Sequence, residues 1–432
     1  MSTVDIDVHH VTRVEGHGNI RVRAADGTVE EVQWQVPEAP RFFEAMVRGR
    51  SWEDIQTIVS RICGICSISH SLAAVKAIDA ALGLTVSEQT EKLRLLTHYS
   101  EQLQSHVLHV GYLVAPDLLG VKSVVPLVAT HPDVVKTIIR AHRAANEWSD
   151  LLAGRTTHPI TLKPGGFSKL PTEAELKALK KTLVEQVVPD LKTIASVVLS
   201  LAGNLPPLNR PTEYVALTHP DGYTFYHGPI ASTDTKETVP VSQFERVVNE
   251  HVSPQSTAKW TRYHRDSYAV GALARFNINA DQLLPLAAET AKSFGLKKGC
   301  CNPFMNSVAQ VVEAVQVVEA SLQLIDELLT AGIKPEKPKV KPRAGEGAGC
   351  VEAPRGILFH RYAFDKQGNC TRANLCIPTN QNHANIQKDF EAWVPQIIDR
   401  PQDEIAHLLE MLVRSYDPCI SCSTHYLDVE FV

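Results

Sequence analysis

Four of the nine cysteines in this 432-residue chain have the spacing of metal ligands. Cys63 and Cys66 form one C-x-x-C pair, and Cys419 and Cys422 form a second. Two thiolates three residues apart on a turn can converge on one ion, so two pairs supply the four sulfurs of a closed tetrahedral shell. A single C-x-x-C pair is equally typical of a redox pair or of two buried thiols.

The long interval between the pairs, from residue 66 to residue 419, helps to decide which kind of site the four thiolates form. A structural zinc site usually joins pairs about 15–20 residues apart. An iron–sulfur cluster accepts any separation, and so does a catalytic centre assembled by the whole fold. Arg61 and Asp417 precede the pairs, and His70 and His425 follow them. Because charged and hydrogen-bonding neighbours tune reactive ligands, these surroundings favour a catalytic centre.

The elements that must bring the two pairs together are mostly helical. Apolar residues recur at helical spacing from Cys66 until Gly83 ends the pattern. Short helices are expected over 37–62, loops and short strands over 204–270, and a loop over 334–349. Alternating residues around Asp26-Gly27 predict a hairpin over 10–36, and a second hairpin is predicted over 355–378. The helical segments are 66–82, 86–114, 131–153, 172–203, 279–296, 302–333, 383–398 and 402–415.

These elements predict a mainly α (α+β) protein, a large helical body with small N-terminal and C-terminal β hairpins. The two cysteine pairs are expected to meet deep in its centre, in one intertwined body. Cys300 and Cys301 are adjacent, and Cys350, Cys370 and Cys376 are expected to pack as small hydrophobic residues. The expected divisions are 1–62 (hairpin and first helices), 63–203 (helical core with the first pair), 204–278 (irregular inserted lobe), 279–349 (helical segment and loop) and 350–432 (hairpin, helices and second pair).

The composition narrows the class of protein. The apolar share is 44% and the charged share 21%, which is typical of globular proteins. A formal net charge of −5 gives no basic field for nucleic acid. No apolar run approaches the roughly 20 residues of a membrane span, and the first residues lack the basic start and apolar core of a signal peptide. We therefore expect a cytoplasmic protein that binds neither nucleic acid nor membrane.

Five segments, in the same order, resemble the signature motifs of the large subunit of nickel–iron hydrogenases. The resemblance implies the hydrogenase large-subunit fold and reversible heterolytic cleavage of H2 to protons and electrons. One alternative is a non-enzymatic subunit of the complex I type, which shares this ancestry but lacks the four cysteines. A second alternative is a hydrogen-sensing regulatory hydrogenase, which has the same site and is not excluded by the sequence. The segments are VTRVEGHGNI (11–20), RICGIC (61–66), EAPRG (352–356), CIPTNQN (376–382) and DPCISCSTH (417–425).

The resemblance implies a binuclear centre on the four cysteines. Cys63 and Cys419 would be terminal nickel ligands, and Cys66 and Cys422 would bridge nickel to an iron that carries two cyanides and one carbon monoxide. The thiolate that accepts the proton would be Cys419.

The same resemblance assigns residues around the two cyanides. Arg355 would contact one cyanide, and Thr379, next to Pro378, would donate to the other. Asp117 and Asp417 are expected to brace Arg355.

The resemblance also implies a proton carrier and a second metal site. Glu15 matches the glutamate through which protons leave the centre, and His17 and His70 are candidates for orienting it. The carboxylate of Glu44, the carbonyl of Leu375 and the imidazole of His425 match the ligands of a buried Mg2+ or Fe2+.

The family's partners follow from the same resemblance. An iron–sulfur small subunit must take the electrons, because this chain has no further cluster motif. An electron-acceptor module would use a nicotinamide, a deazaflavin or a heterodisulfide reductase. A maturation chaperone and an endopeptidase that cuts after His425 would act on the precursor, so residues 426–432 are expected to be removed.

Overall fold

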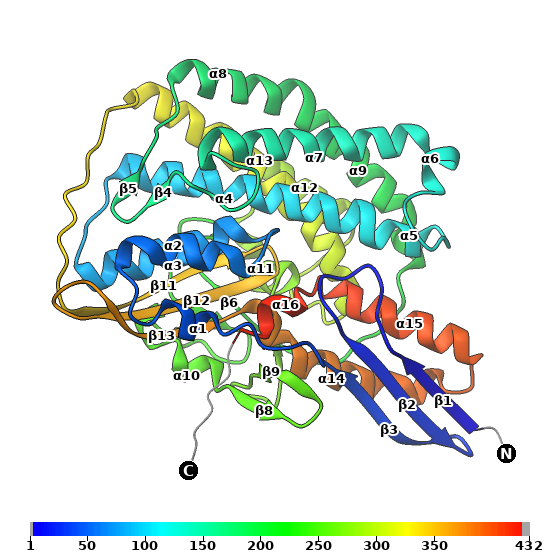
Figure 1. Cartoon of the computed structure of the whole chain (residues 1–432). Helices are drawn as coiled ribbons and strands as arrows, with labels where there is room; N and C mark the ends of the chain where they lie inside the picture. The colour runs from blue at the N-terminus through cyan, green and yellow to red at the C-terminus, as the bar shows by residue number, and fades with distance from the viewer. Residues whose placement is uncertain (1–2, 426–432) are drawn as a thin grey trace, which may run out of the picture.

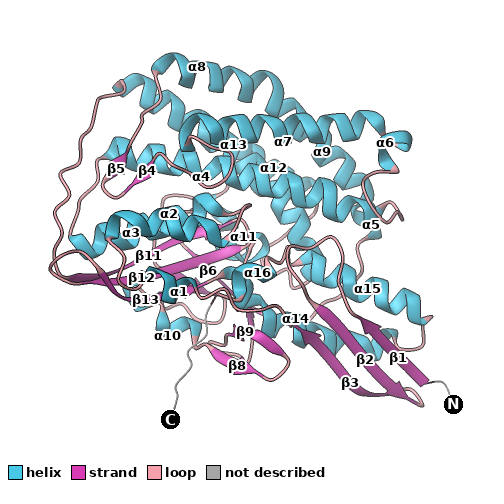
Figure 2. Cartoon of the chain, viewed as in Figure 1, coloured by secondary structure: helices cyan, strands magenta, loops and turns pink. Residues whose placement is uncertain are grey.

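The computed structural model describes residues 3–425. Several long helices form a thick layer on one side, and most of the sheets, with the remaining helices, form a second layer beneath it (Figures 1 and 2). The expectation of a mainly helical α+β body is confirmed. The cleavable tail expected over 426–432 lies outside the described residues.

The helical layer is built from segments whose ends are fixed by capping residues. The Ser87 side chain accepts from the amide of Thr90 at the start of α4, and Thr172 and Glu175 form a capping box at the start of α8. Gly154, in the left-handed conformation, ends α7. The helices of this layer are α4 (Glu88–Leu108), α7 (Pro132–Ala153), α8 (Glu173–Thr182), α9 (Val188–Leu201), α12 (Pro285–Ser293) and α13 (Asn306–Ala331).

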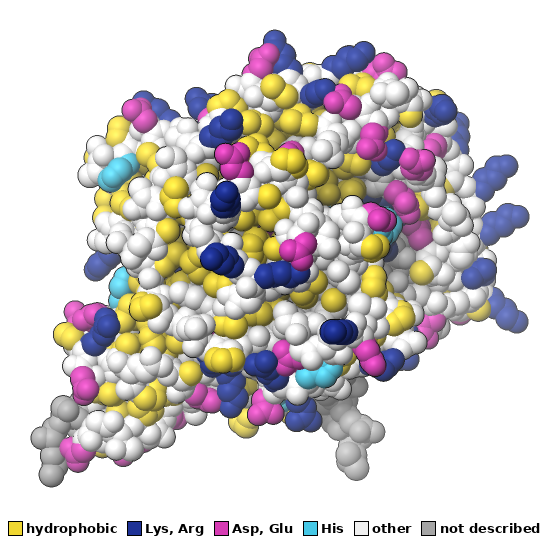
Figure 3. Space-filling model, turned by 180° about the vertical axis from the view of Figure 1, so that it is seen from behind, with side chains coloured by type: hydrophobic (Ala, Val, Ile, Leu, Met, Phe, Trp, Pro, Cys, Tyr) yellow, Lys and Arg dark blue, Asp and Glu magenta, His cyan; other side chains and the backbone are white. Residues whose placement is uncertain are grey.

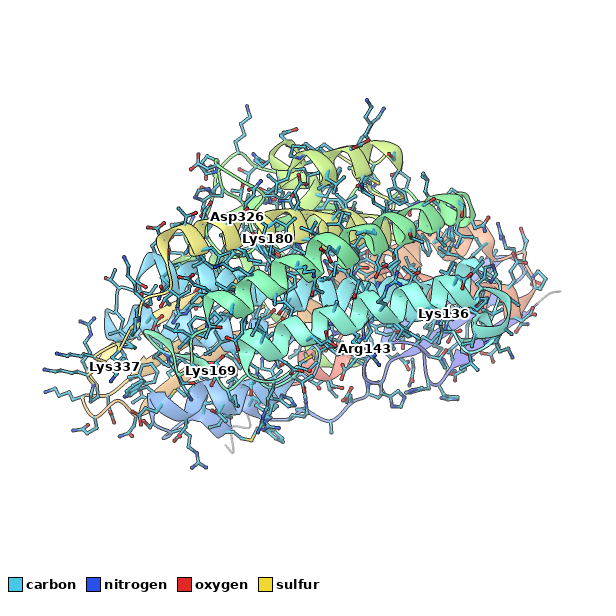
Figure 4. The ribbon with its side chains drawn as sticks, turned by 90° about the horizontal axis from the view of Figure 1, so that it is seen from above. Lys136, Arg143, Lys169, Lys180, Asp326 and Lys337 are labelled. Atoms are coloured by element: carbon cyan, nitrogen blue, oxygen red, sulfur yellow. The ribbon has the colours of Figure 1, made fainter. Side chains whose placement is uncertain are left out.

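Helix α13 runs through the middle of this layer and packs against α4. Together with the turn before it, this helix spans Pro303–Ala331 and would be long and apolar enough to cross a membrane. However, 72% of its most apolar stretch is buried inside the protein. Such burial is typical of a core helix. On the outer side, Lys180 of α8 reaches Asp326 of α13 at 2.5 Å between Nζ and Oδ1 (Figure 4).

A close contact between a helix and a strand positions the first cysteine pair. Helix α3 (Ser67–Leu82) begins directly after Cys66 and lies on strand β11 (Gly345–Ala353). A Cβ on Gly347 would lie 2.3 Å from the Ala81 amide nitrogen, and one on Gly349 would lie 2.2 Å from the Ala73 carbonyl oxygen. The alternating glycines therefore let the helix touch the strand backbone.

Both predicted hairpins are present, and each gains a third strand that the sequence did not reveal. Strand β1 lies beside β2, and β11 lies beside β12, in antiparallel register. Residues 345–349 were expected in a loop, because a Gly-x-Gly-x-Gly run lacks the side chains that mark a strand. The strands are β1 (Thr3–Val8), β2 (Asn19–Ala25), β3 (Thr28–Gln35), β11, β12 (Gly356–Phe364) and β13 (Cys370–Cys376).

Several predicted helices are divided or displaced. The helix expected over 86–114 ends in a π-helical turn, His109–Val114, and that expected over 172–203 contains another, Leu183–Val187. The irregular lobe contains short strands as expected, but also the start of a helical region at α11. The other helices are α1 (Phe43–Val47), α2 (Trp52–Val59), α5 (Ala115–Leu118), α6 (Leu127–Thr130), α10 (Glu245–Val248), α11 (Ala272–Asn279), α14 (Pro378–Ile397), α15 (Gln402–Ser415) and α16 (Ile420–Ser423).

The short strands of the irregular lobe and its neighbours form three small sheets. On the face shown in Figure 3, Lys and Arg side chains are interspersed with Asp and Glu. The strands are β4 (Leu162–Lys163), β5 (Gly166–Phe167), β6 (Glu213–Leu217), β7 (Ile230–Ser232), β8 (His251–Ser253), β9 (Ser256–Trp260) and β10 (Tyr268–Ala269).

Candidate metal centre

The fold brings the two cysteine pairs together in its interior. The four sulfurs all lie within 4.8 Å of one another and are buried. The Cys63 and Cys419 sulfurs are 3.5 Å apart, those of Cys66 and Cys422 4.0 Å, and those of Cys419 and Cys422 2.7 Å. A tetrahedral shell with metal–sulfur bonds of about 2.3 Å would place its sulfurs about 3.8 Å apart. The 3.5 and 4.0 Å separations are close to this value, whereas Cys419 and Cys422 lie closer together, and four thiols are the donor set of a thiophilic metal ion.

The pKa values of three of the four thiols, all except Cys63, are raised, which favours a bound cation. Burial raises the pKa of the Cys66 thiol well above its usual range and that of Cys422 to about 11. Four adjacent thiolates could not be buried here without a positive charge. A metal ion supplies that charge and deprotonates the thiols that bind it.

The N-terminal segment holds the second pair in place. The Ile420 amide donates to the Glu15 carbonyl at 2.9 Å, and the Ser421 amide donates to Glu15 Oε2 at 3.1 Å. Gly16 has φ 85°, and a Cβ there would lie 2.7 Å from the Cβ of Ile420. Glu15 therefore lies beside the short helix α16, which carries Cys422 and begins directly after Cys419.

Arg355 is buried near the sulfurs and keeps a donor unused. Its Nη2 donates to Asp417 Oδ1 at 2.9 Å, and its Nη1 lies 3.5 Å from the Ser105 hydroxyl. Its Nε has no acceptor among the described residues. Gln310 Nε2 donates to the other carboxylate oxygen of Asp417, Oδ2, at 3.0 Å. A buried guanidinium with a free donor suits an acceptor that the metal centre itself would carry.

Thr379 and Pro378 lie at the first turn of α14, directly over the second pair. The Thr379 hydroxyl oxygen accepts from the Cys419 amide at 3.0 Å, so its proton is free to be donated to another acceptor. Pro378 occupies a first-turn position, where a missing amide proton costs nothing.

Asp117 does not brace Arg355, which corrects the prediction. Its carboxylate accepts from Arg414 Nε at 2.8 Å and is also paired with Arg13. Arg414 in turn donates to the Thr12 carbonyl at 3.0 Å. Asp117 therefore ties the segment before Glu15 to the helix before Asp417, and Asp417 alone of the two aspartates contacts Arg355 in the described part of the chain.

The three ligands expected for a second metal converge at another buried point. His425 Nε2 lies 2.8 Å from the Leu375 carbonyl oxygen and 3.6 Å from Glu44 Oε1. His425 Nδ1 lies 3.0 Å from the Cys422 carbonyl oxygen. Both ring nitrogens thus face acceptors, although a neutral imidazole carries only one N–H. A cation between Nε2, the carbonyl and the carboxylate would resolve this conflict.

Comparisons with known proteins match most of the chain, and the family that they identify is consistent with a four-cysteine metal site. The family described as "Nickel-dependent hydrogenase" matches residues 41–150 and 220–425, and a family described as "HoxL-like" matches residues 5–39. The chain belongs to the nickel-dependent hydrogenases. It is a large subunit of that family and an enzyme that acts on H2.

Individual relatives match this hydrogenase over nearly its whole length. The alpha subunit of sulfhydrogenase 2 from Pyrococcus furiosus is 31% identical, covering 98% of this chain and 99% of the relative. The matching subunit of the F420-non-reducing hydrogenase of Methanothermobacter thermautotrophicus is 32% identical, covering 98% and 95%. The crystal structure of an NAD+-reducing [NiFe]-hydrogenase in the H2-reduced state superposes with a TM-score of 0.88 at 26% identity, covering 98% and 100%.

The two histidines considered for orienting the hydrogenase site differ in position. His17 is exposed and contacts the His9 carbonyl and Asn19. His70 is fully buried, its Nδ1 lies 3.1 Å from His360 Nε2, and burial lowers its pKa to about 3. His70 is therefore neutral beside the cluster. Cys350, Cys370 and Cys376 pack in apolar clusters, as predicted, and the half-buried Cys300 and Cys301 pack against one.

Two residues that contact the site could not be found from the sequence. Ser105 lies on α4 and Gln310 on α13, and both are buried polar residues within helices. Neither belongs to a motif, and the residues around them show only helical periodicity. Their proximity to Arg355 and Asp417 depends on how the two helices pack.

Proposed function

We propose that this hydrogenase is a catalytic subunit that cleaves H2 reversibly and passes the electrons to an iron–sulfur small subunit, which delivers them to a soluble acceptor. The observation that carries the proposal is the buried four-sulfur cluster with Arg355 close to it. Cys63, Cys66, Cys419 and Cys422 would hold the nickel and the iron. When bound, this centre supplies the Lewis acidity and the redox chemistry that heterolytic cleavage requires.

The chain's own groups would hold the diatomic ligands and receive the proton. Arg355 Nε and the Thr379 hydroxyl have protons to donate to the two cyanides, and Asp417 keeps the guanidinium in place. The proton would pass to Cys419 and then to Glu15, whose carboxylate already contacts the amide of Ser421. Cys419 is buried, whereas Glu15 is half-buried and lies at the more open end of this path.

The partners proposed for this chain rest on its relatives and on the resemblance of its motifs. The Pyrococcus relative is named as the alpha chain of a hydrogenase, and the Methanothermobacter relative is also named as a subunit. We therefore propose a multisubunit complex in the cytoplasm. The acceptor is a soluble nicotinamide, deazaflavin or heterodisulfide reductase module. A maturation chaperone and an endopeptidase would complete assembly.

The function is tested on the purified complex by metal analysis, infrared spectroscopy and an H2-oxidation assay with a dye acceptor. We expect nickel and iron, cyanide and carbon monoxide bands, and rapid turnover. Absence of nickel and of these bands would contradict the proposal. The full set of bands with very slow turnover would instead indicate a hydrogen sensor.

Glu15→Gln is expected to retain the metals and the infrared bands but to block proton exit. The glutamine oxygen can still accept from the Ser421 amide, yet the side chain cannot carry a proton. Exchange between D2 and water should fall by about 10²-fold or more. Glu38→Gln is the matched control, because Glu38 accepts from the neighbouring His17 amide. Exchange at the wild-type rate in Glu15→Gln would show that protons leave through another group.

Glu44→Gln is expected to remove the second metal, Mg2+ or Fe2+, and to leave nickel bound. An amide oxygen binds a divalent cation more weakly than a carboxylate does. Nickel should remain bound, because Glu44 does not belong to the four-sulfur cluster. Metal analysis of the purified protein measures both contents, with exposed Glu53→Gln as the control. A protein with nickel but no second metal in the wild type would refute this site.

Removal of residues 426–432 is expected to accompany nickel insertion. Intact-mass measurement of active protein should show a chain that ends at His425. A fully active, nickel-containing chain that still ends at Val432 would rule out this processing step.

A further inference from the structure

We propose that Arg275 and Glu313 are positioning residues for Arg355. The buried pair fixes the two-residue turn that carries Arg355, so that its guanidinium keeps its place at the cluster. This inference rests on the role proposed for Arg355. It concerns residues that lie in none of the signature motifs.

The turn that carries Arg355 is not of the type favoured in two-residue hairpins. Strands β11 and β12 pair up to Ala353 and Gly356, which leaves Pro354 and Arg355 as the turn. The turns favoured in such hairpins need a positive φ at their first central residue. Proline is restricted to a φ near −65°, and neither residue is among those with positive φ. The turn therefore lacks the geometry favoured in two-residue hairpins, and contacts from outside it can fix its position.

Arg275, on α11, supplies those contacts. Its Nη1 donates to the Ala353 carbonyl and its Nη2 to the Pro354 carbonyl, both at 2.9 Å. The same two nitrogens reach Glu352 Oε2 at 3.0 Å and Glu313 Oε2 at 2.6 Å, and Nε reaches Glu313 Oε1 at 2.6 Å. All five N–H groups of this guanidinium are thus used. In contrast, Arg355 retains a free donor.

Glu313, on α13, anchors Arg275 from the opposite side. Burial opposes its ionisation, but Arg275 and His106 hold its pKa at about 2, so it stays charged. The Tyr223 hydroxyl donates to Glu313 Oε1 at 2.6 Å, and His106 Nε2 lies 2.9 Å from Oε2. The carboxylate therefore has a single well-defined position.

Helix α13 links this pair to the other support of Arg355. Gln310 lies one turn before Glu313 and donates to Asp417, which binds the Arg355 guanidinium. The same helix thus fixes the backbone before Arg355 through Glu313 and the side chain through Gln310. A buried ion pair is weak evidence for a role in stability, whereas these contacts converge on one functional side chain.

The test compares Arg275→Lys with Arg94→Lys in the assembled hydrogenase. Arg94 is a matched control, because it forms a buried pair with Asp79 at 2.7 Å and does not contact the turn. Lysine keeps the charge but cannot reach all the acceptors. For Arg275→Lys we expect normal nickel, shifted cyanide bands, an unchanged KM for H2 and a kcat lower by about 10- to 10²-fold. Arg94→Lys should show none of these changes.

A second measurement does not depend on the loaded centre. Hydrogen–deuterium exchange of the peptide over residues 351–358 in the metal-free chain should be faster in Arg275→Lys than in wild type, and unchanged in Arg94→Lys. Glu313→Gln, which keeps one acceptor oxygen, should show the same changes to a smaller extent.

The results that would refute this inference differ from those that would refute the proposed function. A wild-type complex without nickel or H2 oxidation would refute the function itself. An active wild type with Arg275→Lys matching Arg94→Lys in bands, kcat and exchange would refute the positioning role. Loss of folding in both Arg275→Lys and Glu313→Gln would also refute it, because the pair would then serve stability alone.

Discussion

Replacement of any one of Cys63, Cys66, Cys419 and Cys422 by serine is expected to abolish both nickel binding and H2 oxidation. The four sulfurs lie within 4.8 Å of one another, and no other cysteine belongs to the cluster in the described part of the chain. A serine hydroxyl is a hard and weakly acidic donor, so it cannot replace a thiolate on nickel. Each variant therefore loses a ligand for which the fold offers no substitute.

Nickel content and H2-oxidation rate of the purified complexes check this expectation. Cys350→Ala is the matched control, because Cys350 is equally buried but packs in an apolar cluster away from the sulfurs. It should keep nickel and activity, as should Cys300→Ser, Cys301→Ser and Cys370→Ser. Full nickel with near-normal activity in any of the four cluster variants would disprove the four-thiolate site.

Arg355→Lys is expected to lower turnover by about 10²- to 10³-fold while nickel content stays close to normal. This is the magnitude typical of losing one preorganised donor at a reacting centre. Lysine retains a charge for Asp417, but it lacks the planar fork that can serve Asp417 and a second acceptor together. The sulfurs do not depend on this side chain for their positions, so metal binding should survive.

Rates measured at saturating H2, together with nickel analysis, test the Arg355 prediction. Arg372→Lys, on the exposed side of β13, provides a control for the same exchange of side chains. Turnover within about threefold of wild type in Arg355→Lys would remove this residue from the mechanism. Loss of nickel in the same variant would show that Arg355 holds the cluster together.

The residues with chemical roles could be located from the sequence because they lie in short contiguous motifs. RICGIC and DPCISCSTH place all four sulfurs, and the second also contains Asp417 and His425. Helix α3 could be predicted from local periodicity up to Gly83, and the hairpin over β12 and β13 from its alternation and its turn. These features depend on neighbours within a few residues, which is the range that a sequence pattern records.

Contacts between distant segments were decided by the tertiary structure alone. Asp117 was assigned to Arg355 from the family resemblance, in a region without a motif, but it pairs with Arg13 and Arg414, which lie 104 and 297 residues away. Strand β11 was missed, because its glycines are explained only by the helix packed against them. Ser105, Gln310 and Arg275 carry no local signal, since each is a polar residue on an otherwise ordinary helix.

The features that the sequence predicted and those that only the folded structure showed differ for one physical reason. Ligand identity is a property of a residue and its immediate spacing, so the sequence by itself indicated which four sulfurs could bind a metal together. The direction of a buried donor depends on which helices and strands surround it, and those contacts form only when the chain is packed. The supports of Arg355 therefore became visible only in the folded protein.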